Sequence, residues 1–135
     1  MTAVFVDANV FLRFFTIDDE GQHQRAAGIL HKAAAGKLEL VTGPPVLFEI
    51  AWTLRSAYSQ PREVVLDVLS RMAALPALRM LDAALVEDAI SLARSSGQEF
   101  ADAYILASSR QAKADGIATF NKKDFERLGA QLFPF

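Results

Sequence analysis

The sequence predicts an α/β fold in which a mostly parallel sheet of four to five short strands is covered on both faces by helices. Three observations indicate this class. The chain has 135 residues, which is a usual size for a single domain. The run Ala3–Val6 has no polar alternation, as expected of a strand buried on both faces. Short apolar runs then alternate with segments of helical periodicity, which is typical of a parallel sheet with crossover helices. We therefore expect residues 1–135 to form one domain.

Five short apolar segments are the expected strands. The first, Ala3–Val6, leads directly into Asp7. The others follow at intervals that leave room for crossover helices, and they are Leu38–Val41, Leu78–Leu81, Ile117–Phe120 and Gln131–Phe133. Ligands of open parallel sheets bind in the crevice beyond the carboxyl ends of the strands, so polar residues that follow these strands are candidates for a site.

Helices are expected wherever apolar residues recur at helical spacing between the strands. Glycine and proline mark their boundaries: Gly36 and Gly97 each close a helix, and Pro44-Pro45 open one. The expected helices are Val10–Phe15, His23–Ala35, Pro44–Tyr58, Arg62–Ala74, a helix capped by Asp82 and stopped by Gly97, Phe100–Ala114 and Asn121–Leu128.

Composition narrows the possible functions. There is no cysteine, which excludes disulfides, thiolate metal sites and cysteine nucleophiles, and His23 and His31 cannot build a histidine-rich metal site. The net charge of −2 argues against a basic surface for tight duplex binding, though not against an enzyme that handles phosphodiesters. Because the sequence shows no signal peptide and no apolar stretch of membrane-spanning length, we expect a soluble cytoplasmic protein that does not engage a membrane.

Four acids occupy settings that set them apart from ordinary surface residues. They are Asp7 after the first strand, Glu49 in an otherwise apolar helix, Asp102 in the first turn of the helix from Phe100, and Asp124 after the strand Ile117–Phe120. Helix capping or turn formation is an alternative explanation for the three aspartates. For Glu49 the alternative is a position at the edge of the apolar stripe, in solvent or paired with Arg55.

Taken together, converging carboxylates favour a metal ion. Their mutual repulsion is relieved by protonation or by a cation. Hard oxygen ligands without histidine or cysteine indicate Mg²⁺ or Mn²⁺. Such an ion activates water and stabilises the charge that develops on phosphate during an in-line displacement, so the acids predict phosphodiester hydrolysis.

The segments that carry these acids resemble the PIN-domain family and, within it, the small VapC-like ribonuclease toxins of type II toxin-antitoxin pairs. The matching segments occur in the family's order and cover nearly the whole chain: VDANV at 6–10, Glu49 in its apolar helix, DAYILA at 102–107 and ATFNKKDF at 118–125. The resemblance implies a three-layer α/β/α sandwich with a five-stranded parallel sheet.

The same resemblance implies a Mg²⁺- or Mn²⁺-dependent endoribonuclease that acts as a toxin, with a cognate antitoxin that blocks the site and usually a homodimer. Asp7, Glu49 and Asp102 match the first three metal-site acids of the family.

The place of the fourth acid is open between Asn121 and Asp124, because some family members carry the acid at the first position and others three residues later. We prefer Asp124. Asn9 and Asn121 are then neutral positioning groups, and Thr119 is a supporting hydroxyl.

Two other functions are compatible with parts of the pattern. A receiver-like signalling domain also gathers acids around Mg²⁺, but Asp7 has no acidic neighbour and the strand Leu38–Val41 is not followed by a phospho-accepting aspartate. A catalytically weak PIN-like binding protein is favoured by Asn121, if that residue takes the place of the acid.

Aromatic residues are more abundant than these short helices can easily bury. They are Phe11, Phe14, Phe15, Phe48, Trp52 and Tyr58. We expect about half of them to pack in the core and the others to line an antitoxin groove or a dimer interface.

Overall fold

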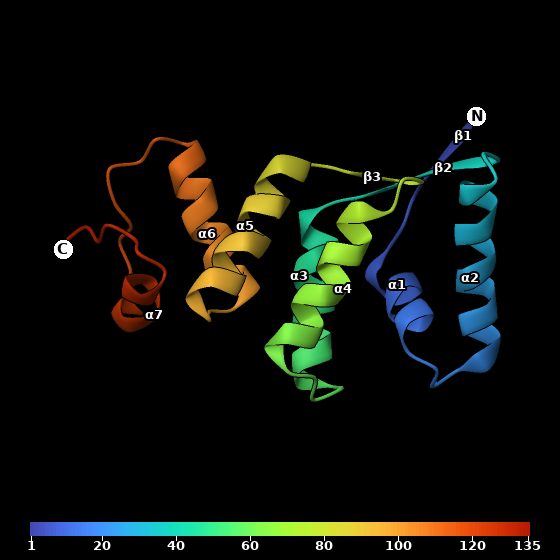
Figure 1. Cartoon of the computed structure of the whole chain (residues 1–135), viewed down its shortest axis with the longest axis horizontal. Helices are drawn as coiled ribbons and strands as arrows, with labels where there is room; N and C mark the ends of the chain where they lie inside the picture. Colours follow the sequence, from blue (N-terminus) through green and yellow to red (C-terminus); the bar gives the residue numbers. More distant parts are fainter.

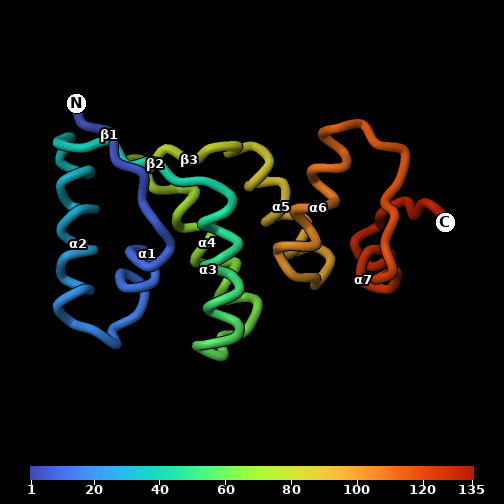
Figure 2. The backbone as a smooth tube through the Cα atoms, turned by 180° about the vertical axis from the view of Figure 1, so that it is seen from behind, coloured from blue at the N-terminus to red at the C-terminus, as the bar shows by residue number.

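The computed structural model describes residues 1–135 as an α/β chain of three strands and seven helices (Figure 1). The strands are β1 (Thr2–Phe5), β2 (Leu38–Thr42) and β3 (Leu78–Met80), and the helices are α1 (Ala8–Phe15), α2 (Glu20–Ala34), α3 (Pro44–Ser56), α4 (Arg62–Ala74), α5 (Ala83–Ser96), α6 (Phe100–Gln111) and α7 (Lys122–Arg127). Figures 1 and 2 show α1 and α2 near the amino-terminal end of the long axis, α3 and α4 in the middle and α5, α6 and α7 towards the other end, with the two termini at opposite ends. None of the helices is both long and apolar enough to cross a membrane.

The sheet is parallel, as predicted, with strand order β1-β2-β3. Val4 of β1 pairs with Leu40 of β2, and Leu40 pairs with Leu78 of β3. Two helices connect each strand to the next, so the carboxyl ends of all three strands meet at one edge. Asp7 follows β1 at that edge.

The prediction of four to five strands in the sheet is wrong, because the last two expected strands do not join it. The segments Ile117–Phe120 and Gln131–Phe133 make only a single parallel bridge, between Ile117 and Leu132. Ile117 donates to the carbonyl of Gln131 and accepts from the amide of Phe133, each at 2.8 Å. The backbone groups of Ile117 are therefore satisfied without the sheet.

Strand β1 is consequently an edge strand, and the expectation that Ala3–Val6 is covered on both faces is also wrong. Phe5 is 58% exposed, and Thr2 and Ala3 are exposed as well. Only Val6, at the end of the run, is fully buried. A strand with one unpaired edge has no neighbour there to cover its side chains.

The hydrophobic core lies between β2, β3 and the helices that follow the strands. Its largest fully buried side chains include Phe11, Leu40, Leu47, Ile50, Leu66, Leu69, Met72, Val86 and Phe100. Helix α5 packs against both α4 and α6, which extends the core towards the carboxyl-terminal part of the chain. Of the aromatic residues noted in the sequence, Phe11 is a core residue, whereas Trp52 is 71% exposed.

Local capping groups set several helix ends. Helix α2 begins earlier than expected because Asp19 accepts a hydrogen bond from the amide of Gln22 at 3.0 Å. Asp82 occupies the N-cap position of α5 as predicted, with a left-handed backbone and φ of 53°, but its side chain makes no capping hydrogen bond. Gly97 ends α5 as predicted, with φ of 73°, a conformation that favours glycine.

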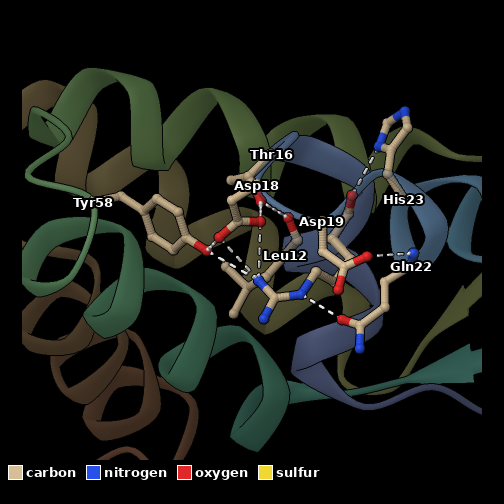
Figure 3. Close-up of polar contacts among 8 residues, drawn as sticks. Leu12, Thr16, Asp18, Asp19, Gln22, His23 and Tyr58 are labelled. Atoms are coloured by element: carbon tan, nitrogen blue, oxygen red, sulfur yellow. Dashed lines mark hydrogen bonds and ion pairs between the residues drawn. The ribbon is translucent and has the colours of Figure 1, made fainter.

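A polar network ties the loop after α1 to the end of α3 (Figure 3). Arg13 Nη1 donates to both carboxylate oxygens of Asp18, at 3.1 and 3.2 Å, and the Tyr58 hydroxyl donates to Asp18 at 2.7 Å. Arg13 Nε donates to Gln22 Oε1 at 2.6 Å. These bonds fix α1 relative to α2 and to the segment that follows α3.

The network makes the stability of the fold depend on pH. The hydrogen bond from Tyr58, with help from Arg13, lowers the pKa of Asp18 below its usual value of 3.8. A carboxyl group whose pKa is lower in the folded state contributes stability above the usual value, and that stability is lost as pH falls through the lowered value. We therefore expect Tyr58→Phe to lower the free energy of unfolding at neutral pH, by an amount that shrinks in acid. Urea unfolding across this range measures the difference; a deficit that is constant with pH or grows in acid contradicts it.

Candidate functional site

Asp102 lies in the first turn of α6 and is partly buried. Burial raises the pKa of its carboxyl, and the negative charges of Asp124 and Glu99 raise this pKa further. Asp102 accepts no hydrogen bond from the backbone of α6, so capping does not explain its position. The structure therefore holds a carboxylate where other negative charges oppose its ionisation.

Asp124 approaches Asp102 from the start of α7. The amide nitrogen Nδ2 of Asn121 donates to Asp124 Oδ2 at 3.0 Å, and the backbone amide of Asn121 donates to Thr119 Oγ1 at 2.9 Å. Asp124 also has a loose ion pair with Arg127, at 3.9 Å. Thr119 thus orients the turn, and the Asn121 side chain orients the Asp124 carboxylate, whose charge acts on Asp102.

Asp7 is exposed at the carboxyl end of β1. Its carboxylate accepts a hydrogen bond from the amide of Ala8 at 2.7 Å, which confirms the interpretation of Asp7 as the cap of α1. The fully buried hydroxyl of Thr42 donates to the carbonyl of Val6 at 3.0 Å and so joins the ends of β1 and β2 directly before Asp7. One oxygen of the Asp7 side chain is engaged, and the group as a whole is open to solvent.

Glu49 is exposed on α3, whose buried side is formed by Val46, Leu47, Ile50 and Leu54. Of the two alternatives given for Glu49, the position in solvent is confirmed, whereas the pairing with Arg55 is wrong, because Arg55 pairs with Glu99 at 2.6 Å. Glu49 has no ion pair or side-chain hydrogen bond.

Glu99 and Arg55 lie beside Asp102 but are not among the site residues predicted from the sequence. Glu99 adds negative charge beside Asp102 and links the start of α6 to α3 through its ion pair with Arg55. These residues and Asp102 line one cavity of about 620 Å³, together with Phe48 and the exposed Trp52. The spacing of three residues between Glu99 and Asp102 was the available signal, since it fits neighbouring positions at the start of a helix.

Of the other three predicted acids, Asp124 is the one whose charge raises the pKa of Asp102; Asp7 and Glu49 are not among the causes of that shift. No group of three or more histidine, aspartate or glutamate side chains is arranged to hold a metal ion. The four acids are therefore not assembled as one metal site in this structure. Mg²⁺ keeps several waters and is often held by only one or two carboxylates, and the repulsion between Asp102 and Asp124 is the kind that such an ion relieves. Asp102 and Asp124 carry the carboxylate oxygens that a hydrated divalent ion takes as ligands.

Comparison with known proteins gives one match. A family model described as PIN domain matches residues 4–131. No curated protein and no solved structure is a significant match to the chain. The matched range contains all seven residues considered for the site: Asp7, Asn9, Glu49, Asp102, Thr119, Asn121 and Asp124.

Proposed function

The chain belongs to the PIN-domain family, whose members are generally metal-dependent nucleases, and from this premise we propose that it is a Mg²⁺- or Mn²⁺-dependent endoribonuclease. The observation that carries the proposal is the pair of Asp102 and Asp124, two carboxylates whose charges oppose each other beside a cavity. In the proposal the enzyme is the toxin of a toxin-antitoxin pair and acts in the cytoplasm.

Within this proposal Asp102 and Asp124 hold the metal ion, and Asn121 keeps the Asp124 carboxylate in place through its 3.0 Å hydrogen bond. A bound divalent ion supplies an activated water and stabilisation of the charge on the phosphate. The protein contributes the partly buried position of Asp102, which strengthens electrostatic interactions there. The ion pair of Arg55 and Glu99 fixes the wall of the cavity next to Asp102.

We assign Asp7, Asn9 and Glu49 to the same site as its second group of ligands. Neither Asp7 nor Glu49 has an ion-pair partner, and both are exposed; one oxygen of Asp7 caps α1, which leaves its other oxygen and the Glu49 carboxylate free to bind a ligand. Helix α3 already contacts the start of α6 through Arg55 and Glu99, and the proposal requires the Asp7 and Glu49 side chains to move towards Asp102 and Asp124 when RNA or a second subunit binds.

Exposed aromatic surface supports the proposed protein partners. Trp52 and Phe5 both expose more than half of their surface. Large exposed apolar patches mark partner sites, and exposed aromatic side chains are the residues from which such patches are built. We propose that a cognate antitoxin or a second copy of the chain in a homodimer covers them.

The metal requirement gives the direct test. Purified protein, free of antitoxin, is expected to cleave single-stranded RNA in Mg²⁺ or Mn²⁺, to stop in EDTA, and to recover when excess metal is restored. Gel analysis of an end-labelled RNA measures cleavage, and single-stranded DNA of the same sequence is the substrate control. Cleavage that persists in EDTA contradicts the metal requirement. Equal cleavage of DNA contradicts the assignment to RNA.

A binding protein without catalysis is the second candidate, and the observation that favours it is that no three or more acids are grouped to hold a metal ion. It predicts that RNA binds with equal affinity in Mg²⁺ and in EDTA and is not cut in either. The receiver-like alternative has no such support, since the family match covers nearly the whole chain.

A further inference from the structure

A second cavity, between α1 and α2, is lined mainly by polar side chains. Its volume is about 450 Å³, and its polar lining comes from Asn9, Arg13, Gln22 and Arg25, over an apolar floor that includes Val10 and Ile29. The two helices lie side by side in both views of the backbone (Figures 1 and 2). Two arginines in one groove are notable in a chain with a net charge of −2.

The two arginines differ in how far they are engaged. Arg13 uses Nε and Nη1 for Gln22, Asp18 and Tyr58, which leaves Nη2 without a partner. Arg25 is exposed and has neither an ion pair nor a hydrogen bond. The ion pair with Asp18 compensates the positive charge of Arg13. Arg25 therefore supplies the uncompensated positive charge of this groove.

The groove starts next to Asp7. Asn9 is in the first turn of α1, two residues after Asp7, and Asn9 and Arg13 are four residues apart on one face of the helix. A linear ligand lying in the groove therefore runs from the arginines to the carboxyl end of β1, where Asp7 is exposed.

We propose that the groove between α1 and α2 binds a backbone phosphate of single-stranded RNA and guides the strand towards Asp7. The inference rests on the proposed function for its choice of ligand. Guanidinium groups match phosphate oxygens in a planar, two-bond geometry, and neutral amides such as those of Asn9 and Gln22 donate further hydrogen bonds. The polar lining suits a phosphate better than a base, which needs an aromatic platform for stacking.

The test is RNA binding by Arg25→Ala in an Asp102→Asn background, in EDTA, so that no cleavage interferes. Fluorescence anisotropy with a labelled single-stranded RNA is measured over a range of salt concentrations. We expect Kd to rise about 10-fold, the effect of losing one charge-assisted contact. The slope of log K against log salt should fall in magnitude by about 0.7, the value for one phosphate contact on a single strand. Arg25→Lys should keep the slope and lose only part of the affinity.

Arg71→Ala is the matched control, because Arg71 is an exposed arginine on α4 without an ion pair and outside this groove. If Arg25→Ala and Arg71→Ala weaken RNA binding equally, the groove assignment is overturned, whether or not the wild-type chain cleaves RNA. If the wild type fails to cleave RNA but Arg25→Ala selectively weakens binding, the proposed catalysis fails and the groove assignment stands. A labelled polyglutamate peptide is the second probe. Arg25-dependent binding of that peptide, without any such effect on RNA, assigns the groove to an acidic protein and overturns the proposal.

Discussion

Asp102→Asn should abolish RNA cleavage, with a loss of at least about 100-fold in kcat. Substituting a residue that only hydrogen-bonds to a metal ligand commonly lowers activity by about 10- to 100-fold, so losing a ligand itself should cost at least as much. The carboxylate of Asp102 is the partly buried member of the pair with Asp124, and asparagine removes its charge with almost no change in shape. Single-turnover cleavage of an end-labelled RNA in Mg²⁺ measures the loss. Asp115→Asn is the matched control, because Asp115 is an exposed aspartate on the loop after α6.

Stability separates loss of chemistry from loss of folding in this experiment. The folded state raises the pKa of Asp102, so it favours the protonated carboxyl. That favourable contribution is present at low pH and is lost as pH rises through the raised pKa, which leaves an unfavourable charge at neutral pH. Asparagine removes this charge, and the free energy of unfolding of the variant at neutral pH should therefore equal or exceed that of the wild type. If Asp102→Asn is both inactive and less stable than the wild type, the loss of activity does not support a catalytic role for Asp102. If Asp102→Asn is stable and fully active, Asp102 has no catalytic role.

The double variant tests whether the two acids act as one unit. Residues that act together in catalysis show effects that do not add. Asp102→Asn with Asp124→Asn should therefore be no slower than Asp102→Asn alone. Multiplicative losses would mean that the two carboxylates contribute separately, despite the effect of Asp124 on the pKa of Asp102.

The sequence predicted the alternation of elements better than it predicted the sheet. Each apolar run bounded by glycine, proline or other turn residues forms a strand, a bridge or a helix. The local apolar pattern and these turn residues are enough to specify that choice. Which strands pair is a long-range property. Ile117 has the same apolar character as β1 residues, but its backbone bonds go to Gln131 and Phe133 instead of to β1, and nothing in the local pattern distinguishes these partners.

In the candidate site, too, the features set by local sequence were predicted and those set by long-range contacts were not. The positions of Asp7 after β1 and Asp102 at the start of α6 follow from local signals and were predicted. The ion pair of Arg55 with Glu99 joins residues 44 positions apart in the chain, so no spacing rule reveals it. Whether the four acids assemble into one metal site likewise depends on how helices distant in the chain pack together, and the structure has no group of three or more acids arranged to hold an ion.

Phe11→Ala should destabilise the fold by about 3–5 kcal/mol, the usual cost of removing a buried phenylalanine ring. Phe11 is fully buried and packs α1 against the core. This helix is capped by Asp7 and carries Asn9 and Arg13. Urea unfolding followed by circular dichroism measures the free energy of unfolding. Because total stability is about 5–15 kcal/mol, Phe11→Leu, with an expected cost below about 1.5 kcal/mol, provides a variant that keeps the fold.

Phe120→Ala makes the same chemical change at a surface position, since Phe120 is 91% exposed and its ring contacts that of Phe135. Its effect should stay within about 0.5 kcal/mol, as for most surface substitutions. Equal losses for Phe11→Ala and Phe120→Ala would show that Phe120 is buried in solution, most simply by a second copy of the chain, and dilution would then lower the stability of the wild type. A small loss for Phe11→Ala would instead show that α1 is held by the network of Arg13, Asp18 and Tyr58 more than by the core. The Tyr58→Phe variant distinguishes that case, because its loss would then exceed that of Phe11→Ala.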